Sequence, residues 1–261
     1  MPLSDSNALL LRAIRDALRR ILVHYGFWFN ETLHQFGLPE ALALEKEVGD
    51  RVLDLALLRL SQTLGFEVDN GVPAALGRLA PDRLEALLDT LAKLWLASDG
   101  IWFQAVEAKT SIHDAKRVND TCWTRFSPFE AGRIKALLEL PDAAADPAPL
   151  ATLKTILAHR LYSRINCQEV VEETPHSFIF RMTDCRVQAA RRRKGLADYD
   201  CRSGGLVEYV SLARAVHPAI VVECLACPSG EPQAAEQKPR QAWYCAWRFS
   251  LAESNPKSET L

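Results

Sequence analysis

The sequence predicts an α+β fold in which a helical N-terminal region precedes an antiparallel sheet with helices. Apolar residues recur at the helical period over the first 160 residues, and after residue 170 they follow the pattern of strands. Four of the seven cysteines lie between residues 201 and 245, where they can tie distant segments together. We therefore expect a helical region over residues 1–146, an α+β domain over 147–252 and a disordered tail over 253–261.

Three long helices are predicted in the first half of the chain. The first carries an apolar stripe with arginines between its members, formed by Leu9, Leu10, Ala13, Ile14, Leu18, Ile21 and Leu22. The second runs from about residue 39 to 64 and ends at Gly65, ahead of the turn residues 69–71. The third begins at Pro81 and continues to about Lys109.

Shorter elements complete the predicted chain. Further helices are expected over residues 112–123, 128–138 and 150–163, with a linker over 141–147. Two strands should flank a Thr-Pro turn within residues 170–180, followed by helices over 185–194 and 206–216. Strands over residues 220–223 and 243–251 should close the sheet, separated by a polar, mobile loop over 228–240.

Composition and charge exclude several classes of function. The chain has 261 residues, nearly half of them apolar and a quarter charged, with a net charge of −2. Such a charge gives no bulk attraction to nucleic acid or to anionic lipid. The apolar runs fall far short of a membrane helix, and the first residues lack the pattern of a signal peptide. We expect a cytoplasmic protein that binds neither nucleic acid nor a membrane. A homodimer is compatible with the sequence.

The cysteines predict a metal site in the C-terminal domain. Cys224 and Cys227 form a C-x2-C step, in which a tight turn brings two thiolates to one side. Cys201 and Cys245 supply two further thiolates, which complete the tetrahedral shell of Zn²⁺ and make the site structural. An iron–sulfur cluster also takes four thiolates, but the dense cysteine runs of ferredoxins do not occur in this sequence. The alternative interpretation is that these cysteines are unrelated small core residues.

The order of these cysteines, with Cys245 ahead of the aromatic segment 246–249, resembles the four-vinyl-reductase-type domain over about residues 150–252. Sensor members of that family hold zinc with three cysteines and a glutamate, and Cys224 stands where the glutamate would be. The whole chain also resembles bacterial proteins of unknown function related to aminothiazoline-carboxylate hydrolases. The segments that carry this second resemblance are 99–103, 185–191 and 243–247. It implies a zinc-stapled fold in which helices and an antiparallel sheet enclose a small-molecule pocket.

Cys185 is a candidate nucleophile and a candidate ligand contact. It opens a predicted helix, where the helix dipole and two nearby arginines favour a thiolate. The charge of Asp184 opposes that ionisation, and a half-buried packing thiol is the alternative interpretation. Gln188 and Arg192 fall one turn apart on the same helix and share a face with Cys185, so we expect both at the ligand.

An aromatic stripe on the third helix contains a carboxylate. Trp95, Asp99 and Trp102 follow helical spacing, and a carboxylate in such a stripe is costly unless it is paired. Asn119 likewise interrupts the apolar set that includes Trp123 on the next helix. Polar groups among tryptophans suit a pocket with an apolar wall and a few directing contacts. Alternatively, Asp99 accepts a hydrogen bond from the end of a neighbouring helix.

These observations leave three functions open. The leading one is a cytoplasmic small-molecule-binding protein with zinc in a structural role. The second is a hydrolase acting on a small heterocycle or amide, with Cys185 or Asp99 as the reacting group. The third is a helical protein-interaction scaffold, which would need no pocket.

Overall fold

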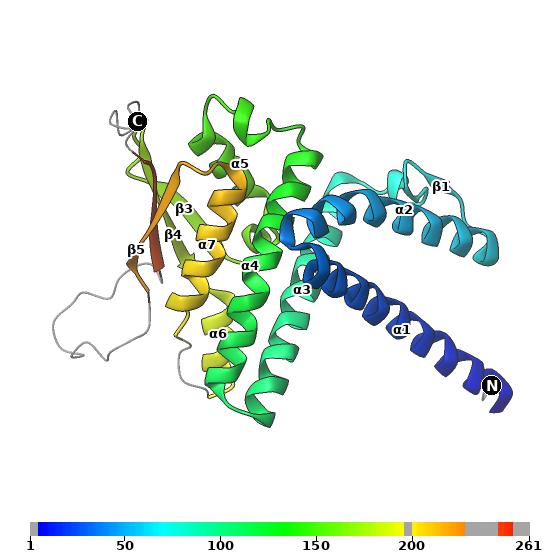
Figure 1. Cartoon of the computed structure of the whole chain (residues 1–261). Coiled ribbons are helices and arrows are strands. Elements are labelled where there is room, and N and C mark those ends of the chain that lie inside the picture. The colour runs from blue at the N-terminus through cyan, green and yellow to red at the C-terminus, as the bar shows by residue number, and fades with distance from the viewer. Residues whose placement is uncertain (1–4, 196–199, 228–244, 253–261) are drawn as a thin grey trace. The chain divides into compact units, whose positions relative to one another are not determined.

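The structure is a computed structural model that describes residues 5–195, 200–227 and 245–252 (Figure 1). The chain divides into two compact units, with the division between Leu79 and Ala80. The predicted boundary at residue 146 therefore lies inside the second unit. The predicted mobile loop over 228–240 and the predicted tail over 253–261 lie outside the described residues.

Unit 1 is a pair of long helices with a short hairpin. Helices α1 (Asp5–Phe36) and α2 (Leu38–Leu64) are followed by strands β1 (Val68–Asp69) and β2 (Val72–Pro73) and by the 3₁₀ turn η1 (Leu76–Arg78). Gly65 ends α2 in the left-handed conformation, at φ 75°, as its position in the sequence predicts. Asn70 and Gly71 form the hairpin turn with φ of 49° and 74°, the conformation for which an Asn-Gly pair is suited.

Unit 2 begins with two long helices, α3 (Pro81–Lys109) and α4 (Ile112–Leu137). The prediction of two separate helices over 112–123 and 128–138 is wrong, because α4 continues through Pro128. A proline inside a helix costs about 3 kcal/mol or more. The buried residues on both sides of it, including Trp123, Ala131 and Ile134, hold α4 as one helix.

The remaining helical elements of unit 2 are shorter. They are η2 (Ala143–Ala145), α5 (Pro149–His159), η3 (Leu161–Arg164), α6 (Arg186–Arg193) and α7 (Arg202–Val216). The predicted helix over 150–163 is thus α5 followed by the separate turn η3. The residue between them, Arg160, has an extended backbone and is buried.

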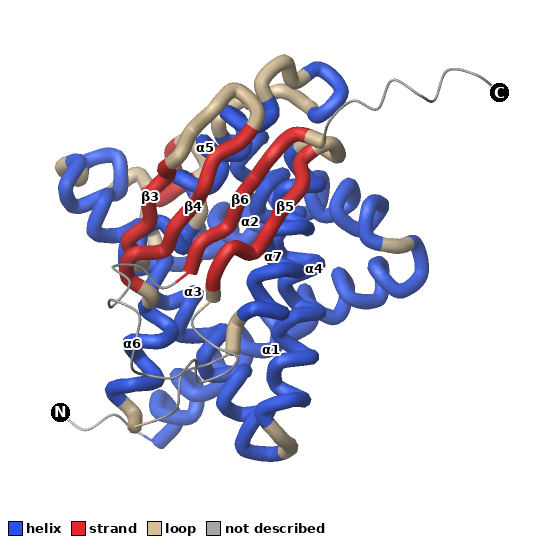
Figure 2. Tube along the Cα trace, turned by 90° about the vertical axis from the view of Figure 1, so that its left-hand side faces the viewer, coloured by secondary structure: helices blue, strands red, loops and turns tan. Residues whose placement is uncertain are grey.

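Four antiparallel strands form the sheet of unit 2, in the order β3-β4-β6-β5. Their bounds are β3 (Cys167–Val171), β4 (Ser177–Asp184), β5 (Ile220–Ala226) and β6 (Cys245–Leu251). Phe178 pairs with Phe249 and Phe180 with Trp247, so these aromatic rings share one face of the sheet. Helices of unit 2 cover that face (Figure 2). The other face carries polar pairs such as Glu223 with Arg248, in which Nη1 of Arg248 lies 2.8 Å from Oε2 of Glu223.

The core of unit 2 lies between this aromatic face and helices α4, α5 and α7. Leu153, Leu212 and Phe249 are completely buried in it. A helical N-terminal region followed by an antiparallel sheet with helices is the α+β arrangement that the sequence predicts, and the prediction of fold class is confirmed. No helix within the described ranges combines the length and apolar content needed to cross a membrane.

Candidate functional site

A cavity of about 500 Å³ lies within unit 2. Helices α3 and α4 form one side of it, and α6 and the first turns of α7 form the other. Residues in and after η3, together with strand residues, line the remainder. Its apolar wall includes Leu96, Phe103, Trp123, Met182 and Trp247. This volume and this predominantly apolar wall are typical of sites that enclose a small molecule.

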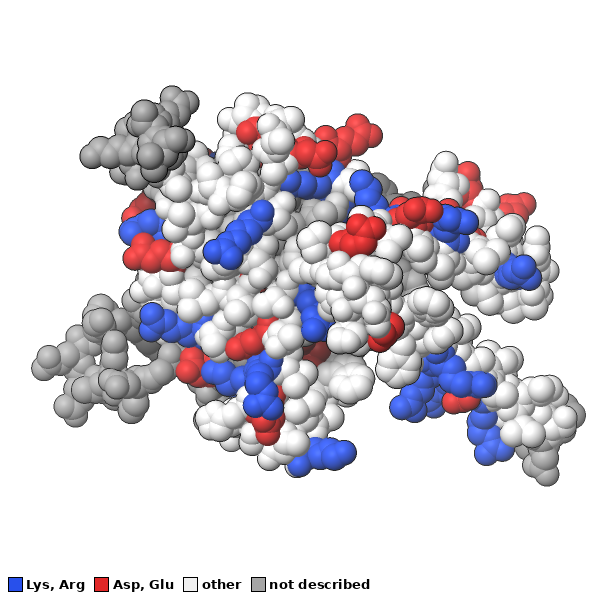
Figure 3. Space-filling view, viewed as in Figure 1, with Lys and Arg blue, Asp and Glu red and all other residues white. Residues whose placement is uncertain are grey.

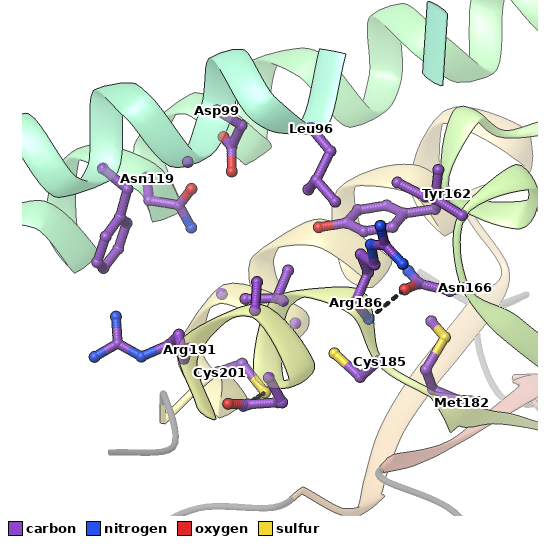
Figure 4. A pocket seen from close by; sticks show the side chains of 18 of the residues that line it. Leu96, Asp99, Asn119, Tyr162, Asn166, Met182, Cys185, Arg186, Arg191 and Cys201 are labelled. Carbon is purple, nitrogen blue, oxygen red and sulfur yellow. Dashed lines mark hydrogen bonds between the residues drawn. The ribbon is translucent and has the colours of Figure 1, made fainter. Parts of the chain in front are cut away.

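A few polar side chains point into the cavity from different elements (Figure 4). Asp99 and Asn119 approach from α3 and α4, and the Tyr162 hydroxyl approaches from η3. Burial raises the pKa of the Asp99 carboxyl. Burial also raises the pKa of Tyr162 well above its usual value, so the phenol stays neutral. The cavity therefore offers a few directing hydrogen-bond groups within an apolar wall.

Asn166 connects the cavity to the start of α6. Its Oδ1 accepts a hydrogen bond from the backbone N–H of Arg186 at 2.8 Å, which satisfies a free donor at the helix N-terminus (Figure 4). The Nδ2 of Asn166 is buried and has no hydrogen-bond partner among the described residues. A buried unpaired donor is costly, and a ligand acceptor in the cavity would satisfy it.

A buried ion network supports the floor of the cavity. Arg160, only 2 % exposed, donates to Glu130 at 2.7 Å and to Glu208 at 2.6 Å. Burial raises the pKa of Glu208, although the Arg160 charge opposes that shift. Burial would lower the pKa of Arg160, but the two carboxylates outweigh it and hold that pKa above its usual value. Because Glu208 also lines the cavity, the network fixes the position of α7 there.

The outer rim of the cavity is tied by polar contacts between α6 and α3. Lys194 donates to the Gln104 side chain at 3.0 Å, and Arg191 lies 3.6 Å from Glu107. These contacts connect helices that are far apart in the sequence. They hold α6 over the cavity.

The structure brings five of the predicted ligand contacts to this cavity, namely Asp99, Asn119, Trp123, Cys185 and Gln188. Trp95 packs against Trp123 and Tyr162, with ring centroids 6.0 Å and 5.0 Å away. It supports the wall and lines a smaller hollow of about 370 Å³ instead. Trp102 borders that second hollow and is 72 % exposed, so it lies at the surface.

Arg192 is exposed, and Arg191 lines the cavity in its place. Cys185 is the extended N-cap residue of α6, with φ −113° and ψ 107°, and so lies outside the helix. Within the helix, the side that faces the cavity continues from Gln188 to Arg191. Burial raises the pKa of Cys185, backbone hydrogen bonds from Gln188 and Val187 at the start of α6 lower it, and the charges of Asp184 and Cys227 raise it. The role of Cys185 as a nucleophile stays a prediction.

The predicted zinc ligands lie near one another at one end of the sheet. The sulfurs of Cys201 and Cys227 are 3.3 Å apart, and Cys201 and Cys245 both line the cavity. Cys224 lies on β5 opposite Trp247 and does not line the cavity. Within the described part of the chain, no three His, Cys, Asp or Glu side chains form a metal-binding group.

Residues 77–251 match the model of DUF6125, a family of unknown function. The chain belongs to this family. The DUF6125 match ends at the last residue of β6, so it includes both the cavity and the cysteines beside it. Among curated proteins and among solved structures, none matches the chain. The DUF6125 match does not test the resemblance to the four-vinyl-reductase-type domain or to the hydrolases, which stays a prediction.

Several residues of the site have no part in the sequence-based prediction. They include Tyr162, Asn166, Glu208 and Tyr209. Glu208 could have been found, because it lies one turn before the apolar Leu212, as Asp99 lies within an aromatic stripe. Tyr162 and Asn166 could not, because they lie in and after a short 3₁₀ turn that has no periodicity.

Proposed function

We propose that unit 2 binds a small, mostly apolar molecule in the cavity between α3, α4, α6 and α7. The observation that carries this proposal is a partly open cavity of about 500 Å³ whose apolar wall carries polar groups from separate elements. The ligand would carry a hydrogen-bond acceptor for Asn166 and further polar atoms for Asp99 and Asn119. A cytoplasmic location, as expected from the sequence, is part of the proposal.

The test is native mass spectrometry of the purified full-length protein, followed by the same measurement on two variants of α6. Ala190 lines the cavity, whereas its neighbour Ala189 does not. Ala190→Trp should fill the cavity and abolish a retained small molecule, and Ala189→Trp should keep it. Thermal-shift measurements with a panel of aromatic and heterocyclic carboxylic acids and amides would complement the native spectra. A wild-type protein that retains no molecule, and that no compound of the panel stabilises, would contradict the proposal.

A hydrolase acting on a small heterocycle or amide is the second candidate function. Asp99 favours it, because a half-buried carboxyl with a raised pKa at a cavity wall can act as a general acid. Cys185 weakens it, because a thiol with a raised pKa is a poor nucleophile. Turnover of a bound heterocycle or amide by wild-type protein, and its loss in Asp99→Asn, would favour the enzyme over the binding protein.

A further inference from the structure

The fold brings four cysteines to one end of the sheet of unit 2. Cys185 directly follows β4, Cys227 directly follows β5, and Cys245 is the first residue of β6. Because β6 lies between β4 and β5 and is antiparallel to both, these three positions share one end. Cys201 is the N-cap residue of α7, and its sulfur lies 3.3 Å from that of Cys227.

A close helix–strand contact holds Cys201 in this position. A Cβ atom at Gly205 would lie 2.5 Å from a ring carbon of Trp247, so only glycine allows this approach. The backbone N–H of Gly205 donates to the carbonyl of Cys201 at 2.8 Å. The first turn of α7 is therefore pressed against β6 two residues beyond Cys245. The thiol of Cys201 has little freedom to move away from the strand ends.

Cys185 is a better fourth partner for this group than Cys224. Cys185, Cys201 and Cys245 line the same cavity, which Cys224 does not line. Cys185 directly follows β4, at the end of the sheet where Cys227 and Cys245 lie. Cys224 pairs with Trp247 further into the sheet.

We propose that Cys185, Cys201, Cys227 and Cys245, the four thiols gathered at this end of the sheet, bind one zinc ion beside the cavity. Four thiols bind Zn²⁺ as thiolates and release four protons, with no change of oxidation state. Binding draws the sulfurs to about 2.3 Å from the ion and leaves no open position, so the ion is structural. It fixes the start of α6 to the sheet. The zinc site requires the thiols alone, whether or not the cavity binds a small molecule.

The first test uses the wild-type full-length protein, reduced, freed of metal with a chelator and handled without oxygen. Alkylation followed by peptide mapping is carried out with and without one equivalent of Zn²⁺. Zinc should slow the labelling of Cys185, Cys201, Cys227 and Cys245 by at least about tenfold. Labelling of Cys224 and of the exposed Cys122 and Cys167 should not change. Protection of Cys224 in place of Cys185 would overturn the ligand set, and protection of none would overturn the metal site.

The second test compares Cys185→Ser with Cys224→Ser by zinc content and by Co²⁺ absorption. Wild type and Cys224→Ser should bind one equivalent and give the absorption of tetrahedral cobalt thiolate. Cys185→Ser should bind Co²⁺ and Zn²⁺ at least about tenfold more weakly. Equal binding by wild type and Cys185→Ser, or a disulfide between Cys201 and Cys227 in metal-free protein purified without oxygen, would overturn the proposal. The labelling experiment decides the question if a variant fails to fold.

Discussion

The two units use the same helical pattern with different results. Unit 2 buries its apolar residues in a continuous core, with Leu153, Leu212 and Phe249 completely inaccessible. Among the described residues of unit 1, Ala41 alone is buried. Leu22 on α1 is 74 % exposed and Trp28 is 67 % exposed. The comparison teaches that apolar periodicity predicts a helix, whereas burial depends on what packs against it.

The basic residues of unit 1 are unevenly distributed. Lys and Arg gather over α1 on the face shown in Figure 3, where Arg12, Arg15, Arg19 and Arg20 follow one another closely.

The contacts that connect α1 with α2 include a hydrogen bond from Tyr25 to Glu45 of 3.0 Å. Few buried contacts give a low local free energy of unfolding. Matched substitutions in the two units measure this difference directly.

The largest expected difference comes from truncating an aromatic ring in each unit. Phe249→Ala removes a fully buried ring that stacks on Phe178 at 5.2 Å and should cost about 3–5 kcal/mol of unfolding free energy. Trp28→Ala removes an exposed ring and should change the unfolding free energy by less than about 0.5 kcal/mol. Urea denaturation followed by circular dichroism would measure both. A comparable loss for Trp28→Ala would show that α1 is packed in solution.

Removing an ion pair should likewise reduce the free energy of unfolding more in unit 2 than in unit 1. Arg160→Met leaves Glu130 and Glu208 buried without a countercharge and should cost about 3–5 kcal/mol. Arg20 pairs with Asp16 at 2.9 Å, but its side chain is 73 % exposed. Arg20→Met should leave the unfolding transition unchanged, because water screens that pair. A loss below about 1 kcal/mol for Arg160→Met would mean that the carboxylates become protonated or solvated.

Two glycine substitutions should have opposite signs. Gly205→Ala forces a Cβ atom against Trp247 and should destabilise unit 2 by about 1–3 kcal/mol. Gly26 lies within α1, and a Cβ atom there would meet no atom within 4 Å. Gly26→Ala should stabilise α1 by about 0.5–1 kcal/mol. Hydrogen exchange of the α1 and α7 amides would resolve the two effects, and faster exchange of α1 in Gly26→Ala would refute the second expectation.

The smallest expected effect is a pH dependence in unit 2. Burial raises the pKa of Asp99, so the folded state binds this proton more tightly than the unfolded chain. Stability should therefore fall as pH rises from 3.8, the ordinary value, through the raised pKa. Asp99→Asn should remove this dependence and raise the melting temperature at neutral pH.

Asp114 is a control of opposite sign. Its hydrogen bond with Ser111 at the start of α4 lowers its pKa, so its contribution is lost as pH falls through that lowered pKa. Asp114→Asn should reduce stability at neutral pH and leave it unchanged in acid. Thermal denaturation over a range of pH would measure both variants. A melting temperature of Asp99→Asn with the same pH dependence as wild type would contradict the expected shift.

The sequence predicts the fold class because periodicity and turn chemistry are local. Gly65 and the pair Asn70-Gly71 end or reverse the chain where their backbone preferences require it. The continuation of α4 through Pro128 could not be predicted, because tertiary packing overrides the local cost. The division of the chain after Leu79 could not be predicted either, because it depends on which helices pack together. Apolar periodicity contains no information about such packing.

The candidate site is predicted in part for a related reason. Asp99 and Asn119 stand out because each interrupts an apolar stripe on its own helix. Asn166 and Tyr162 reach the same cavity through the arrangement of separate elements, which the sequence does not state. Among the cysteines, the C-x2-C spacing in the sequence points to Cys224 as a predicted zinc ligand. The strand order, which the sequence does not show, brings Cys185 to the same end of the sheet as Cys227.

The buried network of Arg160, Glu130 and Glu208 also constrains how this protein can evolve. Glu130 and Glu208 lie 30 and 48 positions from Arg160, and both accept hydrogen bonds from it. A lineage that replaces Arg160 first must pass through a chain with two buried carboxylates and no countercharge. Selection should remove most such intermediates, so we expect Arg160 to change only together with its partners. Three scattered positions would then be inherited as a single character.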